Sequence, residues 1–204
     1  MSADAALPDR LITAALELLA DQPAEELSIR QVAQRVGVSH QAPYVHFGDR
    51  RRFLAAVAGA GLEVAAADAQ SRVTSAGPDP AVRLRALVRA YLSFVDERPY
   101  VHDLAYGPLV AMRDHPRLQA AALAYWNLLR DTVAANQPVG VPAAEVLRRA
   151  ATAWGTVYGI ARLDAAHKIP RTVPADRSQL LDDAIKTLLE GWRAPSAPGE
   201  RPSR

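Results

Sequence analysis

The chain has 204 residues, of which 50% are hydrophobic and 23% charged, and a formal net charge of +2. This composition excludes an intrinsically disordered chain, and the lack of cysteine excludes disulfides and thiolate metal sites. Because the first residues lack a secretion signal and no stretch approaches about eighteen uninterrupted apolar residues, we expect a soluble, cytoplasmic protein.

Alanine, leucine and arginine are abundant along the chain, and the alternation of apolar and polar residues found in strands is scarce. The sequence therefore predicts an all-α fold. Prolines and glycines separate the helical stretches, most clearly in the segment SAGPDP at residues 75–80. The expected helices cover about 8–21, 28–36, 39–47, 50–74, 80–97, 100–112, 116–136, 143–168 and 176–193.

Residues 28–47 have the pattern of a helix-turn-helix. Ser28 can cap the first helix, and Gly37 ends that helix because glycine adopts the left-handed conformation at little cost. With Ser39 as the cap of the second helix, Pro43 becomes its fourth residue, where a proline removes about one backbone hydrogen bond. We therefore expect a strained but intact first turn.

The second helix of this pair is expected to present one face to the first helix and another to solvent. Tyr44 and Phe47 lie three residues apart and should face back toward the first helix. This arrangement exposes His40, Gln41 and Ala42 at the tip, where their side chains suit base edges and thymine methyl groups in a major groove. The pattern favours a DNA-reading element, and a generic helical hairpin is the alternative.

Charge is unevenly divided over the first quarter of the chain. Residues 28–52 carry five arginines against one aspartate, whereas residues 1–27 carry six acidic residues against one arginine. A local basic face of this kind is typical of a small nucleic-acid contact patch, with an ordinary solvated charge cluster as the alternative.

Residues 15–58, ALELLADQPAEELSIRQVAQRVGVSHQAPYVHFGDRRRFLAAVA, resemble the N-terminal DNA-binding domain of the TetR family of bacterial transcriptional regulators. The resemblance rests on a small residue and a glycine in the turn, a serine that caps the recognition helix, and a Tyr-x-His-Phe motif. It implies a dimeric, all-α repressor whose second domain binds a small molecule. The residues that it places at the DNA are Ser28, Arg30, Ser39, His40, Gln41, Ala42, Tyr44, His46 and Arg50.

Two features depart from the family pattern. The run Gln41-Ala42-Pro43 replaces the more usual Gly-Thr-Leu, and Arg51-Arg52 extends the basic segment. Arg50 stands where the family usually has a lysine facing a phosphate, so the resemblance implies that it keeps this charge and adds a planar fork of donors.

The expected architecture has an N-terminal three-helix helix-turn-helix domain and a C-terminal helical ligand-binding and dimerisation domain. The proline- and serine-rich end of the chain should be disordered. The expected boundaries are 1–58 for the DNA-binding domain, 59–79 for a connecting helix and linker, 80–193 for the second domain and 194–204 for the tail.

Aromatic residues are scattered along the second domain and could fill a helical core or line a cavity for a flat ligand. The segment WGTVYGIARLDA at 154–165 resembles the C-terminal subtype named for a Trp-His-Gly motif, with Tyr158-Gly159 in the His-Gly place. We predict a small hydrophobic or aromatic effector, in a pocket lined by His102, Tyr106, Met112, Trp126 and Tyr158.

Ala151, Gly155 and Gly159 lie four residues apart, a spacing that lets another helix approach closely. The last helix has a broad apolar face that could leave a strip exposed after internal packing. Two such helices from each subunit would form a four-helix seam, with burial inside one subunit as the alternative. The predicted interface of this homodimer comprises Gly155, Leu181, Ile185, Leu188 and Trp192.

The leading functional prediction is a homodimeric repressor that a small ligand releases from a pseudo-palindromic operator on double-stranded DNA. The alternatives are an activator, or a helical scaffold that has lost DNA reading. The five histidines lack metal-binding spacing and no glycine-rich phosphate loop occurs, so we expect no enzyme, no catalytic residue, no metal site and no cofactor.

Overall fold

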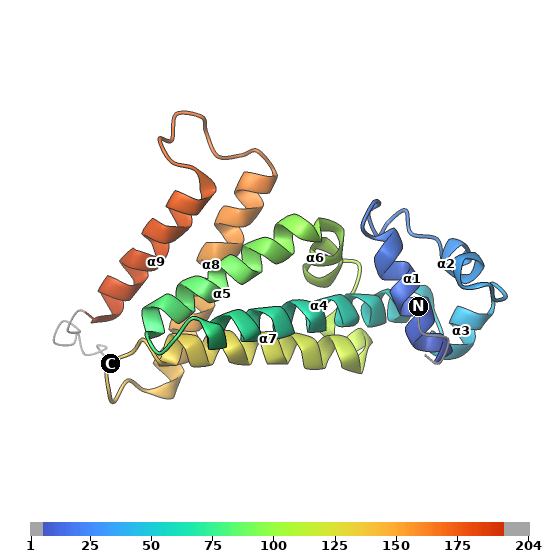
Figure 1. The fold of residues 1–204 in the computed structure, drawn as a ribbon, viewed down its shortest axis with the longest axis horizontal. Coiled ribbons are helices and arrows are strands. Elements are labelled where there is room, and N and C mark those ends of the chain that lie inside the picture. Colours follow the sequence, from blue (N-terminus) through green and yellow to red (C-terminus); the bar gives the residue numbers. More distant parts are fainter. Residues whose placement is uncertain (1–5, 194–204) are drawn as a thin grey trace, which may run out of the picture. The chain divides into compact units, whose positions relative to one another are not determined.

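The computed structural model describes residues 6–193, and the tail predicted at 194–204 lies outside them. The described chain is helical without strands, which confirms the all-α prediction (Figure 1). The helices are α1 (Leu7–Leu18), α2 (Ile29–Val36), α3 (Ala42–Phe47), α4 (Arg50–Ser75), α5 (Pro80–Glu97), α6 (Pro99–Tyr106), the 3₁₀ turn η1 (Met112–Asp114), α7 (Pro116–Ala134), α8 (Ala143–Ala165) and α9 (Arg177–Arg193).

The helix predicted over 100–112 is shorter than expected, because α6 ends at Tyr106. Gly107 has an extended backbone, with φ −87° and ψ −179°. The next residue, Pro108, explains this conformation, since a proline disfavours the helical region for the residue before it. The chain then re-forms a single turn at η1 before α7 begins.

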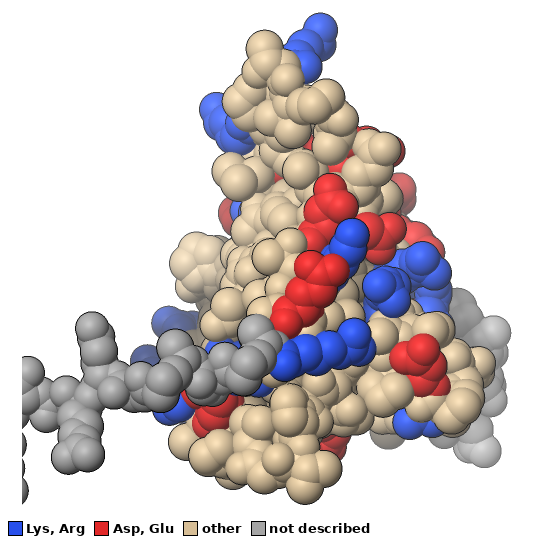
Figure 2. All heavy atoms as spheres, turned by 90° about the vertical axis from the view of Figure 1, so that its left-hand side faces the viewer, with Lys and Arg blue, Asp and Glu red and all other residues tan. Residues whose placement is uncertain are grey.

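The chain forms two compact units. The first comprises the described residues up to Arg72 together with Arg89–Asn127, and the second comprises Val73–Val88 together with the described residues from Leu128 onward. Each unit is described by itself. On the face of the molecule in Figure 2, acidic and basic side chains lie interspersed among uncharged ones.

The core of the first unit is built around α4. Every residue from Phe53 to Leu62 is buried, so this half of the helix is covered on all sides. Two glycines make this close packing possible: a Cβ on Gly59 would lie 2.6 Å from the backbone nitrogen of Leu118, and one on Gly61 would lie 2.3 Å from Val101 Cγ1. The small residues of α4 therefore let α6 and α7 approach its backbone.

Among the described residues, α4 is also the one helix long and apolar enough to cross a membrane by length and composition. Most of its apolar stretch is buried inside the protein, as in the core helix of a soluble domain.

The second unit is organised by the packing of α8 on α9. Small side chains of α8 face large ones of α9, and both sets recur at three- or four-residue spacing. The buried residues are Ala150, Ala153, Val157 and Ala161 on α8, and Leu181, Ile185, Leu189 and Trp192 on α9.

Candidate nucleic-acid interface

The helix α2 begins and ends as its sequence predicts. Ser28 has an extended backbone at the N-cap, and its N–H donates to Oε1 of Gln31 at 3.2 Å. Gly37 follows the helix with φ +77°, and the N–H groups of Gly37 and Val38 bond back to the carbonyls of Gln34 and Ala33. This pattern is a Schellman motif, and it fixes the turn that leads to α3.

The helix α3 begins at Ala42, two residues later than a helix capped by Ser39 would begin, so Ser39 is not its N-cap. Instead, the carbonyl of Ser39 accepts a turn hydrogen bond from the N–H of Ala42 at 3.0 Å. Pro43 is thereby the second helical residue, a position whose N–H has no partner within a helix in any case. The predicted loss of a hydrogen bond at Pro43 is wrong, and this residue is buried.

The two aromatic residues of α3 have different environments. Phe47 is buried, and its ring packs edge-on against Phe53 with centroids 5.1 Å apart. Tyr44, predicted to face inward as well, is 42% exposed. It lines a hollow of about 230 Å³ together with Arg30 and His40. This hollow brings one side chain of α2, one of the turn and one of α3 to a single place on the surface.

The rest of the tip of α3 is mostly exposed. Ser39, His40, Gln41 and His46 are exposed, whereas Ala42 and Ser28 are half-buried. Val45 is 79% exposed, although the predicted contact residues did not include it. The signal that could have identified it is its distance from Phe47: Val45 lies two residues from each of the buried Pro43 and Phe47, and two residues are about 200° around a helix, so Val45 faces away from the core.

Arg50 does not point outward as a phosphate ligand would. Its Nη2 donates to the carbonyls of Ala24, Glu25 and Leu27, at 2.7, 3.3 and 3.3 Å. These carbonyls belong to the loop before α2, so Arg50 ties the first turn of α4 to the beginning of the helix-turn-helix.

The next two arginines pair with acidic side chains. The Nε of Arg51 lies 2.5 Å from Oδ2 of Asp114 in η1, and Nε of Arg52 lies 3.8 Å from Oδ2 of Asp49. The hydrogen bond from Arg51 is the main cause that holds the pKa of Asp114 below its usual range, followed by a bond from the N–H of Ala111.

The segment from η1 to the start of α7 makes further contacts with the helix-turn-helix and α4. The ring of His115 lies 6.5 Å from that of Phe47, and Arg117 pairs with Glu63 at 2.7 Å and with Asp9 at 3.9 Å. Burial is the main cause that lowers the pKa of His115, and the charge of Arg117 acts in the same direction. These packed and ion-paired groups thus link the segment from η1 to the start of α7 with α1, α3 and α4.

Two family models match this chain. Residues 11–57 match the model described as bacterial regulatory proteins of the TetR family, and residues 84–188 match a tetracyclin repressor-like C-terminal domain. The second match alone covers half of the chain. This protein belongs to the TetR family.

Solved structures have the same fold along nearly the whole chain. A protein of unknown function from Rhodococcus sp. RHA1 is 28% identical with a TM-score of 0.75, and the match covers 94% of this chain and 98% of that one. A transcriptional regulator from the same organism is 26% identical with a TM-score of 0.61, over 93% and 100% of the chains. No curated protein matches this chain.

FadR from Bacillus subtilis, solved in complex with stearoyl-CoA, is 12% identical with a TM-score of 0.61, over 90% of this chain and 98% of that one. At this identity the likeness shows the fold alone. As a TetR-family regulator, this protein is a DNA-binding transcription regulator and not an enzyme. The Trp-His-Gly subtype stays a prediction.

The structure brings together two of the residues predicted for the effector pocket of this TetR-family protein. His102 is buried in α6, its ring centroid lies 5.0 Å from that of Tyr106, and its Nε2 lies 2.9 Å from the hydroxyl of Tyr91. Phe94 packs edge-on against the same imidazole at 5.7 Å. Tyr91 and Phe94 were not among the predicted lining residues, although both stand in the aromatic-rich stretch of the sequence.

Tyr125 of α7 is another aromatic residue that the prediction missed. Its hydroxyl is buried and has no hydrogen-bond partner among the described residues, and burial is the main cause that raises its pKa. The remaining predicted residues are dispersed: Met112 is 48% exposed in η1, Trp126 is half-buried in α7, and Tyr158 lies on α8 with its ring 6.4 Å from that of Trp154.

The residues predicted for the dimer interface differ in exposure. Leu181, Ile185 and Trp192 are buried between α9 and α8 of the same chain, and Leu188 is half-buried. Gly155 is exposed on α8. It belongs to a stripe at helical spacing that runs beside the buried side of α8, about a quarter-turn from it, and consists of Leu147, Ala151, Trp154, Gly155 and the half-buried Tyr158.

Proposed function

We propose that this TetR-family regulator is a cytoplasmic, homodimeric repressor, and that a small hydrophobic or aromatic molecule releases it from a pseudo-palindromic operator. The observation that carries the DNA-binding part is the exposed tip of α3 with its hollow, lined by Arg30, His40 and Tyr44. A guanidinium, an imidazole and a phenol in one hollow offer donors for a phosphate or a base edge.

The proposed contacts divide into two kinds. Exposed Arg30, Tyr44 and His46 would bind the DNA backbone, while His40 and Gln41 at the tip of α3 would approach base edges. Ser28, Ser39 and Ala42 would shape the turn, and Arg50 would position it. Because Pro43 causes no loss of hydrogen bonding in α3, it gives no support to a scaffold that has lost DNA reading.

The aromatic cluster around His102 supports an apolar or aromatic effector. Its members offer flat, apolar surfaces and a few directional polar groups, among them the unpartnered hydroxyl of Tyr125. A ligand bound there would release DNA only if it favoured a state in which two recognition helices no longer fit half-sites about 34 Å apart.

A titration of the full chain onto the DNA upstream of its own gene, followed by fluorescence anisotropy at ~150 mM salt, tests the proposal. We expect saturable binding that exceeds binding to a scrambled duplex by about a thousandfold. The double variant R30Q/Y44A should lose most of this preference, whereas R148Q, which removes a charge from exposed α8, should keep it. Equal affinity for both duplexes would contradict specific DNA reading.

A further inference from the structure

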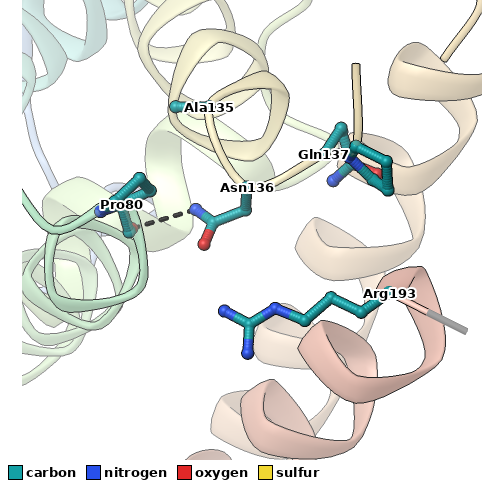
Figure 3. A pocket seen from close by; sticks show the side chains of 6 residues that line it. Pro80, Ala135, Asn136, Gln137 and Arg193 are labelled. Carbon is teal, nitrogen blue, oxygen red and sulfur yellow. Dashed lines mark hydrogen bonds between the residues drawn. The ribbon is translucent and has the colours of Figure 1, made fainter. Parts of the chain in front are cut away.

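Side-chain hydrogen bonds hold both ends of α7. At its end in the second unit, Nδ2 of Asn136 donates to the carbonyl of Pro80 (Figure 3) and to that of Thr132, each at 2.9 Å. At its start in the first unit, Nδ1 of His115 accepts from the backbone N–H of Arg117 at 3.2 Å. An amide does not titrate near neutral pH, whereas an imidazole does, so the start of α7 can respond to protons.

His115 is the N-cap of α7. Its backbone is extended, with φ −153° and ψ 136°, and its carbonyl accepts the first helical hydrogen bond, from the N–H of Gln119 at 3.2 Å. Its side chain accepts from the second helical residue, as a capping side chain does. Because Nδ1 is the acceptor, the neutral ring carries its proton on Nε2. A second proton, on Nδ1, would set a donor against the N–H of Arg117 and remove the cap.

The position of His115 opposes a positive charge. The start of α7 is the positive end of the helix dipole, and the guanidinium of Arg117 adds to this field. Burial is the main cause that lowers the pKa of the ring, and the charge of Arg117 is the second. A proton on His115 therefore favours any arrangement in which the ring leaves this position for solvent.

The carboxylates around this position already have partners. Asp114 accepts from Arg51 at 2.5 Å, while Glu63 and Asp9 pair with Arg117 at 2.7 and 3.9 Å. These three carboxylates therefore offset the charges of arginines. The charged and titratable groups around His115 and the ring of Phe47 are Asp9 of α1, His46 of α3, Arg51 and Glu63 of α4, Asp114 of η1 and Arg117 of α7.

The ring of His115 also supports α3. Its centroid lies 6.5 Å from that of Phe47, the last residue of α3, and Phe47 packs against Phe53 of α4 at 5.1 Å. Phe47 and Pro43 are the buried residues of this short helix, so its position depends on few contacts. A charged imidazole gains little from Phe47, because a cation–π contact needs a separation of about 6 Å or less.

We propose that His115 makes DNA binding through α3 sensitive to protons. The neutral ring caps α7 and packs on Phe47, whereas the protonated ring turns to solvent and releases both contacts. DNA affinity therefore falls as His115 takes up its proton, at a pH below 6.5. This inference rests on the proposed DNA reading by α3 and adds a means of regulation to it.

A titration of the ¹⁵N-labelled full chain from pH 7.5 to pH 5, without DNA, tests the coupling within the protein. We expect the backbone amide signals of Arg117 and Phe47 to shift with a common midpoint below pH 6.5.

Two variants provide the matched comparison. H115N keeps a capping side chain that does not titrate, so the shift of Arg117 should vanish and that of Phe47 should decrease. H167N replaces an exposed histidine of the second unit at φ +53°, a conformation that asparagine tolerates, and should keep both shifts.

The second measurement is the affinity of the parent chain, H115N and H167N for the DNA upstream of its own gene, at pH 7.5 and pH 5 and constant ionic strength. Protons on the exposed His40 and His46 would add positive charge near the DNA in all three chains, so the comparison with H115N isolates His115. We expect the affinity of the parent chain relative to H115N to fall at least about threefold between these pH values, and H167N to follow the parent.

Parallel pH profiles of DNA binding in the parent chain and H115N would overturn the inference. An equal shift of the Phe47 amide in these two chains would overturn it as well. Failure of the proposed DNA reading has a different signature, because neither chain would then prefer this DNA over a scrambled duplex at pH 7.5. The titration without DNA would still decide whether His115 controls Phe47.

Discussion

A basic residue such as Arg50 can act at a DNA interface in two ways: it can bind a phosphate of the DNA, or it can position another part of the protein. A phosphate contact releases a counterion, so its loss lowers the slope of log K against log salt by about 0.9 per contact. Arg50 donates to three backbone carbonyls of the loop before α2, and we expect it to act by positioning that loop. Its replacement should weaken DNA binding at every salt concentration without changing the slope.

The measurement is operator binding of R50Q and R30Q between 50 and 300 mM salt. R30Q should reduce the slope by about 0.9 for each subunit bound, while R50Q should leave it unchanged and still lower the affinity about tenfold. A reduced slope in R50Q would show that its guanidinium turns outward to a phosphate when DNA is bound.

Val45 is the most exposed apolar side chain of α3, and a thymine methyl group is the apolar feature of a major groove. We expect Val45 to contact such a methyl group when the protein binds its operator. Replacement of that thymine by deoxyuridine should then weaken DNA binding about fourfold, since burial of one methyl-sized group contributes about 0.8 kcal/mol. V45A should bind the two duplexes with nearly equal affinity. A full response to deoxyuridine in V45A would assign the methyl contact to another side chain.

The helix-turn-helix also shows which local features the sequence could predict. Ser28 and Gly37 were placed correctly because caps and left-handed turns depend on one or two residue types. The start of α3 and the direction of Tyr44 depend on where Pro43 and Phe47 pack, and packing is not encoded in spacing alone. Arg50 begins α4 as predicted. The carbonyls that it binds lie about 25 residues earlier in the chain, so no local sequence pattern could predict them.

Among the helices, the contact of α4 with α7 requires a glycine. A Cβ on Gly59 would lie 2.6 Å from the backbone nitrogen of Leu118, and no side-chain rotation can relieve such a contact. We expect G59A to lower the free energy of unfolding by about 1–3 kcal/mol, as measured by urea denaturation. G191A on α9, where nothing lies within 4 Å of the new Cβ, should be neutral or slightly stabilising. Equal effects of the two changes would contradict tight packing at Gly59.

The start of α7 should make stability depend on pH. The pKa of His115 is lowered from its ordinary value of 6.5, chiefly by burial, so the unfolded chain takes up this proton first as the pH falls. Stability is then complete above pH 6.5 and decreases below it, until the folded chain is protonated as well. H115Q should reduce the difference in unfolding free energy between pH 7 and pH 5, measured in urea. An unchanged difference would show that other groups account for the pH dependence.

Element boundaries were predictable where proline or glycine marks them. The helices α2, α5 and α7 begin within a residue of the expected positions, each at a serine cap or a proline. The end of α6 was missed because Gly107-Pro108 was read as part of an apolar helical run, although a proline restricts the residue before it. The aromatic cluster at His102 was predicted only in part, since helix spacing does not tell which of several helices meet.

At the scale of the whole molecule, binding to a pseudo-palindromic operator requires two copies of the chain. In a single chain, the predicted α9 residues Leu181, Ile185 and Trp192 are already buried against α8. Beside these buried residues, α8 still exposes the stripe that contains Leu147 and Trp154, which are 43% and 38% exposed. We therefore expect this stripe, with the half-buried Leu188 of α9, to form most of the seam between subunits.

A charge on this stripe should separate the subunits. W154D places a carboxylate where an apolar surface would be buried, so we expect a monomer in sedimentation velocity at concentrations where the parent chain is a dimer. L163D is the control, because Leu163 is 50% exposed on a different side of α8. Since one subunit reaches only one half-site, W154D should bind the full operator at least about 100-fold more weakly than L163D, and both should bind an isolated half-site equally. A dimeric W154D with intact operator binding would place the seam on another face of the chain.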